Sequence, residues 1–129
     1  MNPGTSGPRR QLLVVDAAPE GRFLSEHLLP HWGYDVACAE NGAVALRLAS
    51  DWRFDGALIN LTLPDMDGFA LCERLRAPSR YGLLPVLFTA ASPEAGMVRR
   101  ARETPRAAFI AKPYDHTQLT RLLVQLLTA

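Results

Sequence analysis

The chain has 129 residues and a mass of 14.2 kDa, which is the length of one compact domain. Its 48% hydrophobic and 21% charged residues and its mean hydropathy of -0.01 exclude disordered, collagen-like and disulfide-scaffold proteins. The apolar runs are too short to cross a bilayer, so we expect no transmembrane helix. A net charge of +1 gives no general attraction to nucleic acid or to anionic membranes.

The N-terminal residues are rich in Pro, Gly and Ser, and no apolar segment follows them as it would in a signal peptide. We expect residues 1–10 to form a flexible tail and residues 11–129 to form the folded domain of a cytoplasmic protein. The two cysteines lack the spacing of metal ligands or of a disulfide framework. We therefore interpret Cys38 and Cys72 as reduced core residues.

Short apolar runs alternate with longer runs of helical period, which is typical of an α/β fold with a parallel sheet covered by helices on both faces. Each apolar run is flanked by Asp, Asn, Gly or Pro, which favour turns. The predicted strands are Gln11–Val15, Asp35–Ala39, Gly56–Asn60, Leu84–Thr89 and Ala107–Ala111.

Five helices are predicted between and after these strands from their apolar stripes and their end signals. Pro19 can occupy the first turn of the first helix, Asn41 is an N-cap for the second, and Asp115 with Gln118 forms a capping box for the last. The predicted ranges are 19–29, 42–49, 68–75, 92–103 and 115–127.

Polar residues follow or end four of the predicted strands. They are Asp16, Asn60, Thr89 and Lys112. Because ligands of open parallel sheets bind at the carboxyl ends of the strands, these four residues define the expected site.

With these residues in place, the chain resembles the receiver domain of response regulators in bacterial two-component signalling, over about residues 11 to 127. Five short motifs carry the resemblance, and each lies at the strand end that the fold predicts. They are Leu-Val-Val-Asp at 13–16, Gly-Tyr-Asp-Val at 33–36 with Ala-Glu-Asn-Gly at 39–42, Leu-Pro-Asp-Met-Asp-Gly at 63–68, Phe-Thr-Ala at 88–90 and Ala-Lys-Pro-Tyr-Asp at 111–115. The resemblance implies a flavodoxin-like doubly wound five-stranded sheet in the order 2-1-3-4-5 with five helices.

The family's reaction is phosphoryl transfer from the phosphohistidine of a partner kinase to an aspartate that ends the third strand. Two acids after the first strand hold a divalent cation, and a hydroxyl and a lysine stabilise the phosphorylated form. The aspartate is the nucleophile, while the cation and the ammonium group neutralise the developing charge.

This sequence departs from the family pattern at two positions. Asn60 stands where the phosphorylated aspartate belongs, and a carboxamide cannot form an acyl phosphate. Ala17 stands where the second metal-binding acid belongs, and a methyl group supplies no oxygen ligand for magnesium. We therefore expect weak or absent magnesium binding, no cofactor and no catalysis.

The pocket residues that remain at family positions are Asp16, Thr89 and Lys112. We hypothesise that Lys112 pairs with Asp16 and hydrogen-bonds Asn60, so that the pocket is satisfied without metal or phosphate. In the alternative hypothesis, a small anion, a metabolite or another modification at Thr89 and Lys112 still switches the domain. Asp65 and Asp67 are less favoured as substitute acceptors, because they belong to the loop that the family motif already contains.

Residues 96–129 carry a net charge of +4 and the rest of the chain -3, with basic side chains gathered around the predicted fourth helix. This region is a candidate docking patch for an acidic partner, such as a histidine kinase or an effector, or a homodimer contact through the fourth helix, fifth strand and fifth helix. The alternative is a solvated helix face, and nucleic acid is disfavoured because no DNA-binding motif is present. An inward Phe109 would give this surface one fixed form, although simple core packing explains it equally well. The candidate interaction residues are Arg99, Arg100, Arg102, Arg106 and Phe109.

Overall fold

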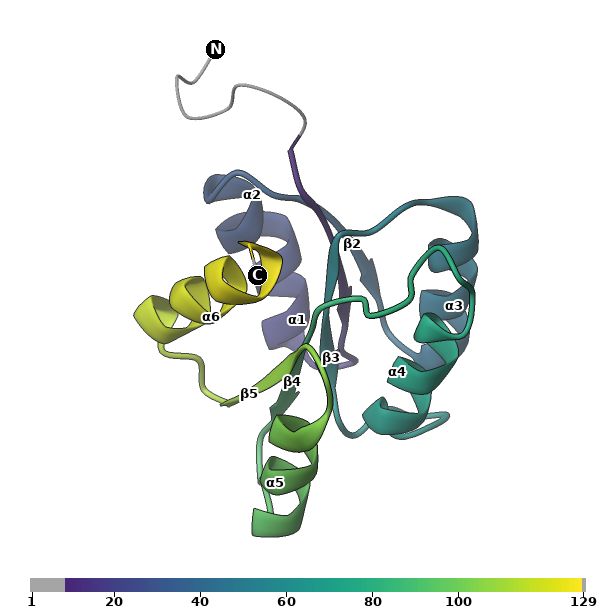
Figure 1. Ribbon diagram of the computed structural model, residues 1–129. Coiled ribbons are helices and arrows are strands. Elements are labelled where there is room, and N and C mark those ends of the chain that lie inside the picture. Colours follow the sequence, from purple (N-terminus) through teal and green to yellow (C-terminus); the bar gives the residue numbers. More distant parts are fainter. Residues whose placement is uncertain (1–8, 129) are drawn as a thin grey trace.

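The computed structural model describes residues 9–128, which contain a five-stranded parallel sheet (Figure 1). The strand order is β2-β1-β3-β4-β5, so the predicted fold class is confirmed. Parallel pairing places the carboxyl ends of all five strands at one edge of the sheet. The strands are β1 (Gln11–Val15), β2 (Asp35–Ala39), β3 (Gly56–Asn60), β4 (Val86–Ala90) and β5 (Ala107–Ala111).

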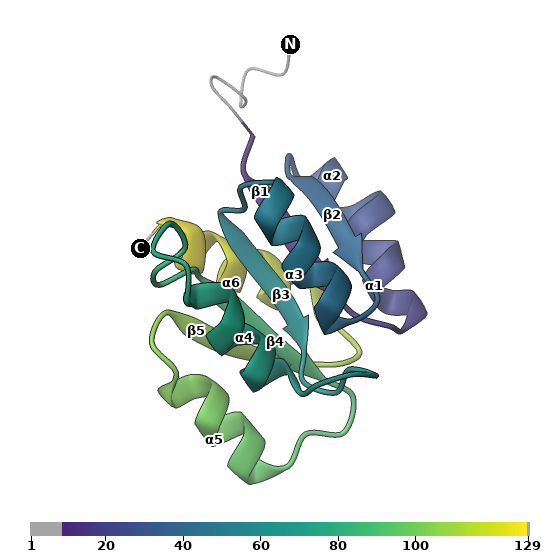
Figure 2. The ribbon, with the colours of Figure 1, turned by 90° about the vertical axis from the view of Figure 1, so that its right-hand side faces the viewer.

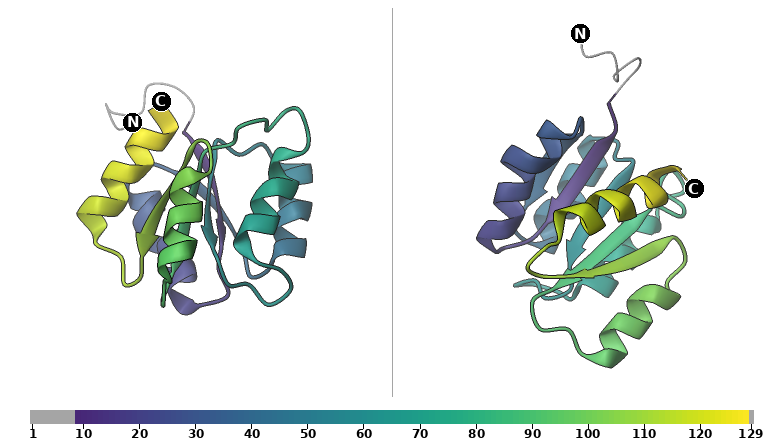
Figure 3. Two further views of the ribbon diagram at one scale, coloured as in Figure 1. Left: turned by 60° about the horizontal axis from the view of Figure 1, so that its bottom comes forward. Right: turned by 90° about the vertical axis from the view of Figure 1, so that its left-hand side faces the viewer.

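Helices cover both faces of this sheet. The first helical stretch is continuous and consists of α1, a π-helical turn η1 and α2, and it shares one face with α6 (Figure 3). The other face carries α3, α4 and α5 (Figure 2). Their bounds are α1 (Pro19–Phe23), η1 (Leu24–Leu28), α2 (Leu29–His31), α3 (Gly42–Asp51), α4 (Gly68–Arg76), α5 (Ala95–Glu103) and α6 (His116–Thr128).

Alternation along the central strands divides the apolar core into two layers. In β1, Leu13 packs in the layer under α3, α4 and α5, while Leu12 packs in the layer under α1 and α6. The central strands are buried along nearly their whole length, which is why they read as continuous apolar runs. The sheet is therefore a rigid platform for whatever its carboxyl edge carries.

Three predicted boundaries are wrong. The fourth helix begins at Ala95 after the N-cap Glu94, and not at Ser92, because that cap is in an extended conformation. The fourth strand spans Val86–Ala90, two residues later at its start than predicted. The first helix does not end before Pro30: the helical stretch runs on through α2. The π-helical turn η1, in which the Leu29 N–H donates to the carbonyl of Leu24, directly precedes the residue that lacks an N–H.

The predicted tail lies mostly outside the described residues, which begin at Arg9. Arg9 itself is tied to the domain, because its guanidinium pairs with Asp35 at 3.2 Å and donates to the carbonyls of Pro30 and Tyr34. Its neighbour Arg10 accepts a backbone hydrogen bond from Asp35. Two residues of the predicted tail, Arg9 and Arg10, therefore contact the folded domain.

The predicted core position of Cys38 is also wrong, whereas Cys72 is buried as predicted. Cys38 lies on the edge strand β2, where a cavity of about 410 Å³ beside α1 leaves the thiol uncovered. Among residues 9–128, no helix is long and apolar enough to span a membrane.

Candidate functional site

The sheet brings the four predicted site residues to its carboxyl edge. Asp16 follows β1 and donates its backbone N–H to Ala39, while Lys112 follows β5 and donates its backbone N–H to Ala90. Asn60 ends β3 and pairs in register with Thr89 of β4. Topology alone therefore assembles a pocket from residues that are far apart in the sequence.

An ion pair is at the centre of this pocket, as predicted. Lys112 Nζ lies 2.7 Å from Asp16 Oδ2, and the two side chains are only 5% and 3% exposed. The other carboxylate oxygen, Oδ1, accepts the backbone N–H of Ala18 at 2.9 Å. Both carboxylate oxygens of Asp16 are therefore engaged by groups of the protein itself.

The start of α1 packs directly against Asp16. A methyl group placed on Gly21 would lie 2.5 Å from Asp16 Cβ, which is closer than side-chain atoms approach one another. Gly21 therefore lets the helix pack against the carboxylate and exclude water from the ion pair. Glycine at this position is a requirement of close packing, because its backbone is ordinary helix.

The predicted hydrogen bond from Lys112 to Asn60 is wrong. Asn60 Nδ2 donates to the backbone carbonyl of Thr62 at 2.9 Å, and its Oδ1 accepts a long hydrogen bond of 3.4 Å from Thr89. A carboxamide has its own N–H donors, so this side chain satisfies a carbonyl in the following loop. The ammonium group, in turn, is already held by Asp16.

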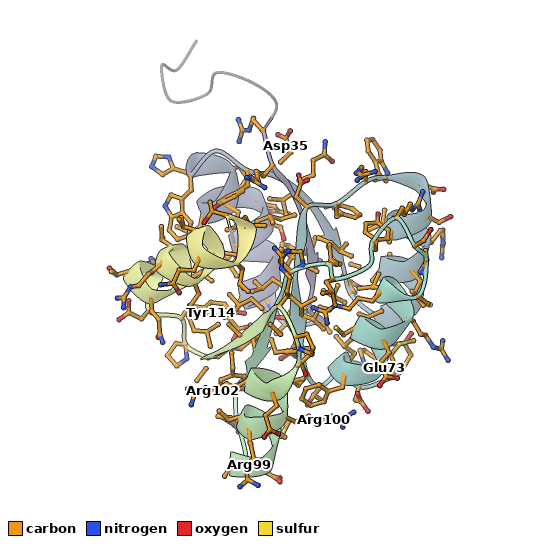
Figure 4. All side chains as sticks on the ribbon, in the orientation of Figure 1. Asp35, Glu73, Arg99, Arg100, Arg102 and Tyr114 are labelled. Atoms are coloured by element: carbon orange, nitrogen blue, oxygen red, sulfur yellow. The ribbon has the colours of Figure 1, made fainter. Side chains whose placement is uncertain are left out.

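One pocket residue was not predicted as part of the site. The hydroxyl of Tyr114 is buried, and its ring follows Lys112 between β5 and α6 (Figure 4). Burial raises the pKa of this phenol and the charges of Asp16 and Glu20 add to the increase, while the Thr89 hydroxyl lowers it. The tyrosine of the Lys-Pro-Tyr motif was the available signal, but the sequence does not say which way its ring turns.

These residues do not fit the magnesium ion of active receiver domains. Asp16 is the one carboxylate among the four predicted residues, and its oxygens face Lys112 and the N–H of Ala18. Ala17 offers no side-chain oxygen. A hard divalent cation needs several free oxygen ligands, so the pocket favours the ammonium group in its place.

Asp65 and Asp67 have structural roles instead. Asp65 accepts the backbone N–H groups of Gly42 and Ala43 in the first turn of α3, and these hydrogen bonds lower the pKa of its carboxyl. Asp67 caps α4 by accepting the N–H of Ala70 at 2.8 Å. Both carboxylates are held at helix N-termini, as expected for capping residues.

The four predicted arginines are exposed, and two of them also contact other groups of the domain. Arg99, Arg100 and Arg102 lie on α5, and the guanidinium of Arg100 also lies over the Phe69 ring (Figure 4). The Arg106 side chain follows α5 and donates to the backbone carbonyl of Leu126, so it connects the segment after α5 to α6. Phe109 is buried at 8% exposure, which places its ring in the core layer under α5.

Comparisons with known proteins identify the family of the chain. The family model of the response regulator receiver domain matches residues 12–124. A probable transcriptional regulator, ycf29, of Porphyra purpurea is 28% identical over 119 residues, covering 90% of this chain and 55% of its own length. The transcriptional regulatory protein GltR of Pseudomonas aeruginosa is 31% identical over 119 residues, covering 92% of this chain and 49% of its own length. The chain thus spans about half the length of these relatives.

Solved structures show the same fold. The chemotaxis response regulator CheY4 of Vibrio cholerae superposes with a TM-score of 0.82 at 25% identity, covering 92% of this chain and 99% of that one. A response regulator described as putative, from Chloroflexus aurantiacus, gives a TM-score of 0.86 at 26% identity, covering 95% and 100%. With the carboxyl-edge pocket and the family match over most of its length, the chain belongs to the response regulator receiver domain family.

Proposed function

We propose that this receiver domain works in two-component signalling without being phosphorylated, as a protein-interaction module. The observation that carries the proposal is the buried ion pair between Asp16 and Lys112 at 2.7 Å. In the family reaction these two residues serve the cation and the phosphoryl group. Here each already neutralises the other in a site from which solvent is largely excluded.

The chemistry of the acceptor position supports the same proposal. An acyl phosphate requires a carboxylate oxygen as the nucleophile, and Asn60 has a carboxamide whose Nδ2 is bound to the Thr62 carbonyl. Without a nucleophile the cation has no transition-state charge to neutralise. The loss of the metal ligand at Ala17 is therefore consistent with the loss of the acceptor.

The proposed output surface is the exposed side of α5 with its arginines. Arg99 and Arg102 present two positive charges there, while the buried ring of Phe109 favours one fixed form of the surface behind them. An acidic surface of a signalling protein, such as a histidine kinase or an effector, is the partner that this charge pattern favours. A homodimer through α5, β5 and α6 is the competing assembly, and measuring the mass of the free protein in solution distinguishes it.

The alternative of a small anion at Thr89 and Lys112 is less well supported. An anion would have to displace the Asp16 carboxylate from the buried ammonium group and leave a negative charge without a partner. Such a displacement costs several kcal/mol, roughly the cost of breaking a buried pair. The Asp16 carboxylate is already the anion that neutralises the Lys112 ammonium group.

The test is the backbone amide spectrum of the ¹⁵N-labelled chain before and after addition of magnesium and acetyl phosphate. We expect the resonances of Thr89, Lys112 and α5 to stay unchanged. The variant A17D/N60D restores both missing carboxylates and serves as the positive control, in which those resonances should shift. Shifts at α5 in the unaltered chain that require both reagents would overturn the proposal.

A further inference from the structure

The edge strand β2 has one open side. It pairs with β1 alone, and among residues 9–128 no other strand pairs with it. On the side that faces β1, the N–H of Asp35 donates to the backbone carbonyl of Arg10. Because the backbone groups of successive residues alternate in direction, those of Val36 and Cys38 point away from β1. Their N–H and C=O groups form a short row of donors and acceptors that is available to another chain.

The sequence of β2 leaves this open side unprotected. Edge strands are often blocked by a lysine, a proline or a β-bulge. The strand β2 contains neither lysine nor proline, and its five residues pair with β1 in unbroken register. Cys38 is exposed, so the strand is accessible at that position. An extended segment of another chain can therefore reach the backbone of β2.

A hollow flanks this edge on each face of the sheet, and Figure 2 shows β2 between α1 and α3. The apolar hollow has a volume of about 270 Å³ and is lined by Ala37 together with Trp52 and Phe54 at the end of α3. The acidic hollow has a volume of about 410 Å³ and lies between Cys38 and α1. Ala37 packs in the core layer under α3, and Cys38 is the next residue of the strand, so the two hollows lie on opposite faces.

The apolar hollow offers surface that the domain leaves uncovered. The Trp52 side chain is 58% exposed, whereas Phe54 is buried. The hydroxyl of Tyr81 donates to the backbone carbonyl of Trp52 at 2.6 Å, which fixes the chain at this point. Exposed apolar surface beside an open strand is suited to an apolar side chain of a partner.

The acidic hollow has one charge without a counter-charge. Its lining includes three acids, Asp16, Glu26 and Glu40, and one base, Arg22. Asp16 is neutralised by Lys112, and Glu40 pairs with Arg22 at 3.1 Å. No salt bridge in the described part of the chain includes Glu26. This carboxylate therefore favours a basic side chain in the hollow.

We propose that the open side of β2 binds an extended segment of a partner protein that carries an apolar and a basic side chain on opposite faces. The segment adds a strand to the sheet, and its main chain forms hydrogen bonds with Val36 and Cys38. The apolar hollow lies beside residues 35–37 and the acidic hollow beside Cys38 and Glu40. The two side chains are therefore about three residues apart, an odd spacing that directs them to opposite faces of the sheet.

This surface lies away from the proposed output surface. The strands β2 and β5 are the two outer strands of the sheet, and α5 directly precedes β5. A domain with both surfaces occupied joins two signalling proteins. That consequence rests on the proposed function of α5, whereas the binding site at β2 does not.

The test is a titration of the ¹⁵N-labelled chain with the capped peptide Lys-Thr-Thr-Leu-Thr-Thr-Lys, whose sequence reads the same in both directions and so fits parallel or antiparallel addition. We expect saturable shifts of the Val36 and Cys38 amides and of the Trp52 indole N–H, with a dissociation constant of about 1 mM or lower. Hydrogen exchange of the Val36 and Cys38 amides should slow at saturation, because both become donors in the new ladder.

A control peptide of the same composition tests the spacing. In Thr-Lys-Thr-Leu-Thr-Lys-Thr the lysines lie on the same face as the leucine, so the two hollows cannot be filled together and binding should weaken at least about fivefold. Equal binding of the two peptides would overturn the proposal. Concentration-dependent shifts at Val36 and Cys38 without peptide would also overturn it, because a second copy of the chain would then occupy the edge.

Matched protein variants test the two hollows. E26Q should weaken binding about threefold to fivefold, as expected for one exposed ion pair, whereas E103Q removes the same charge from α5 and should bind as the parent does. W52A should weaken binding by removing the exposed wall of the apolar hollow. Equal effects of E26Q and E103Q, or peptide shifts centred on β5, would contradict the site. The titration contains no magnesium or acetyl phosphate, so the inference and the proposed function can fail separately.

Discussion

The buried ion pair makes a prediction about stability that can be worked from its geometry. Replacing Lys112 by Met removes the ammonium group and leaves the Asp16 carboxylate, 3% exposed, without its counter-charge. Breaking a buried pair from one side costs about 3–5 kcal/mol, because the remaining charge stays desolvated. That loss is a large part of the roughly 5–15 kcal/mol that stabilises a domain, so K112M should be marginally folded.

The assay is urea unfolding at pH 7, with the free energy of unfolding extrapolated to water. R121M is the matched control: it removes one positive charge from the exposed side of α6 and should change stability by no more than about 0.5 kcal/mol. The double variant D16N/K112M removes both charges and keeps an acceptor for the Ala18 N–H. It should therefore recover most of the stability that K112M loses.

Two outcomes would refute this reasoning about the ion pair. The first is a loss in K112M no larger than that in R121M, which would mean that Asp16 is solvated in the folded protein. The second is additive behaviour of D16N and K112M, since residues that form a pair must show a coupling energy. If K112M is too unstable to measure alone, the double variant D16N/K112M still tests the ion pair. A folded double variant supports the buried pair, and an unfolded one contradicts it.

Two further predictions concern residues around the pocket. G21A should destabilise the domain, because its methyl group would meet Asp16 Cβ at 2.5 Å. This loss should outweigh the better helix propensity of alanine, which is about 1 kcal/mol. Thermal unfolding measures the difference, and a more stable G21A would show that α1 is not packed on Asp16. The second prediction concerns Asp65, because the N–H groups of Gly42 and Ala43 lower the pKa of its carboxyl in the folded protein. The ionised carboxylate therefore stabilises the fold fully above the pKa of the unfolded chain, which is about 3.9. This stabilisation is lost as the pH falls through the lower pKa of the folded protein. D65N should accordingly be less stable than the parent at pH 7 and approach it in urea unfolding below about pH 4, whereas a gap independent of pH would contradict the capping role.

Much of the fold follows from local patterns in the sequence. The strands β1 and β3 read as continuous apolar runs because helices cover both of their faces. The N-cap Asn41 was predicted correctly, since its Oδ1 accepts the N–H of Val44, as such a side chain does at the start of a helix. The pairing of Lys112 with Asp16 could be predicted by counting charges at the carboxyl edge. The family site has three acids there, whereas the corresponding positions of this chain retain one, Asp16.

Other features depend on contacts that a sequence does not encode locally. The amide of Asn60 bonds the carbonyl of Thr62 because the loop after β3 turns that carbonyl toward it. Cys38 has the apolar neighbours of a core residue, but it lies on an edge strand beside an open cavity. The position of Tyr114 in the pocket follows from the path of the chain between β5 and α6, and the start of α5 follows from an extended Glu94.

The measurement that tests the central claim most directly is the intact mass of the chain after incubation with magnesium and acetyl phosphate. The unaltered chain should gain no phosphoryl group, because Asn60 supplies no nucleophile and Lys112 is held by Asp16. The variant N60D should gain little, and A17D/N60D should gain one group, because it alone has both the acceptor and the metal ligands. A stoichiometric gain of one phosphoryl group by the unaltered chain would contradict the account and would assign the acceptor role to another carboxylate.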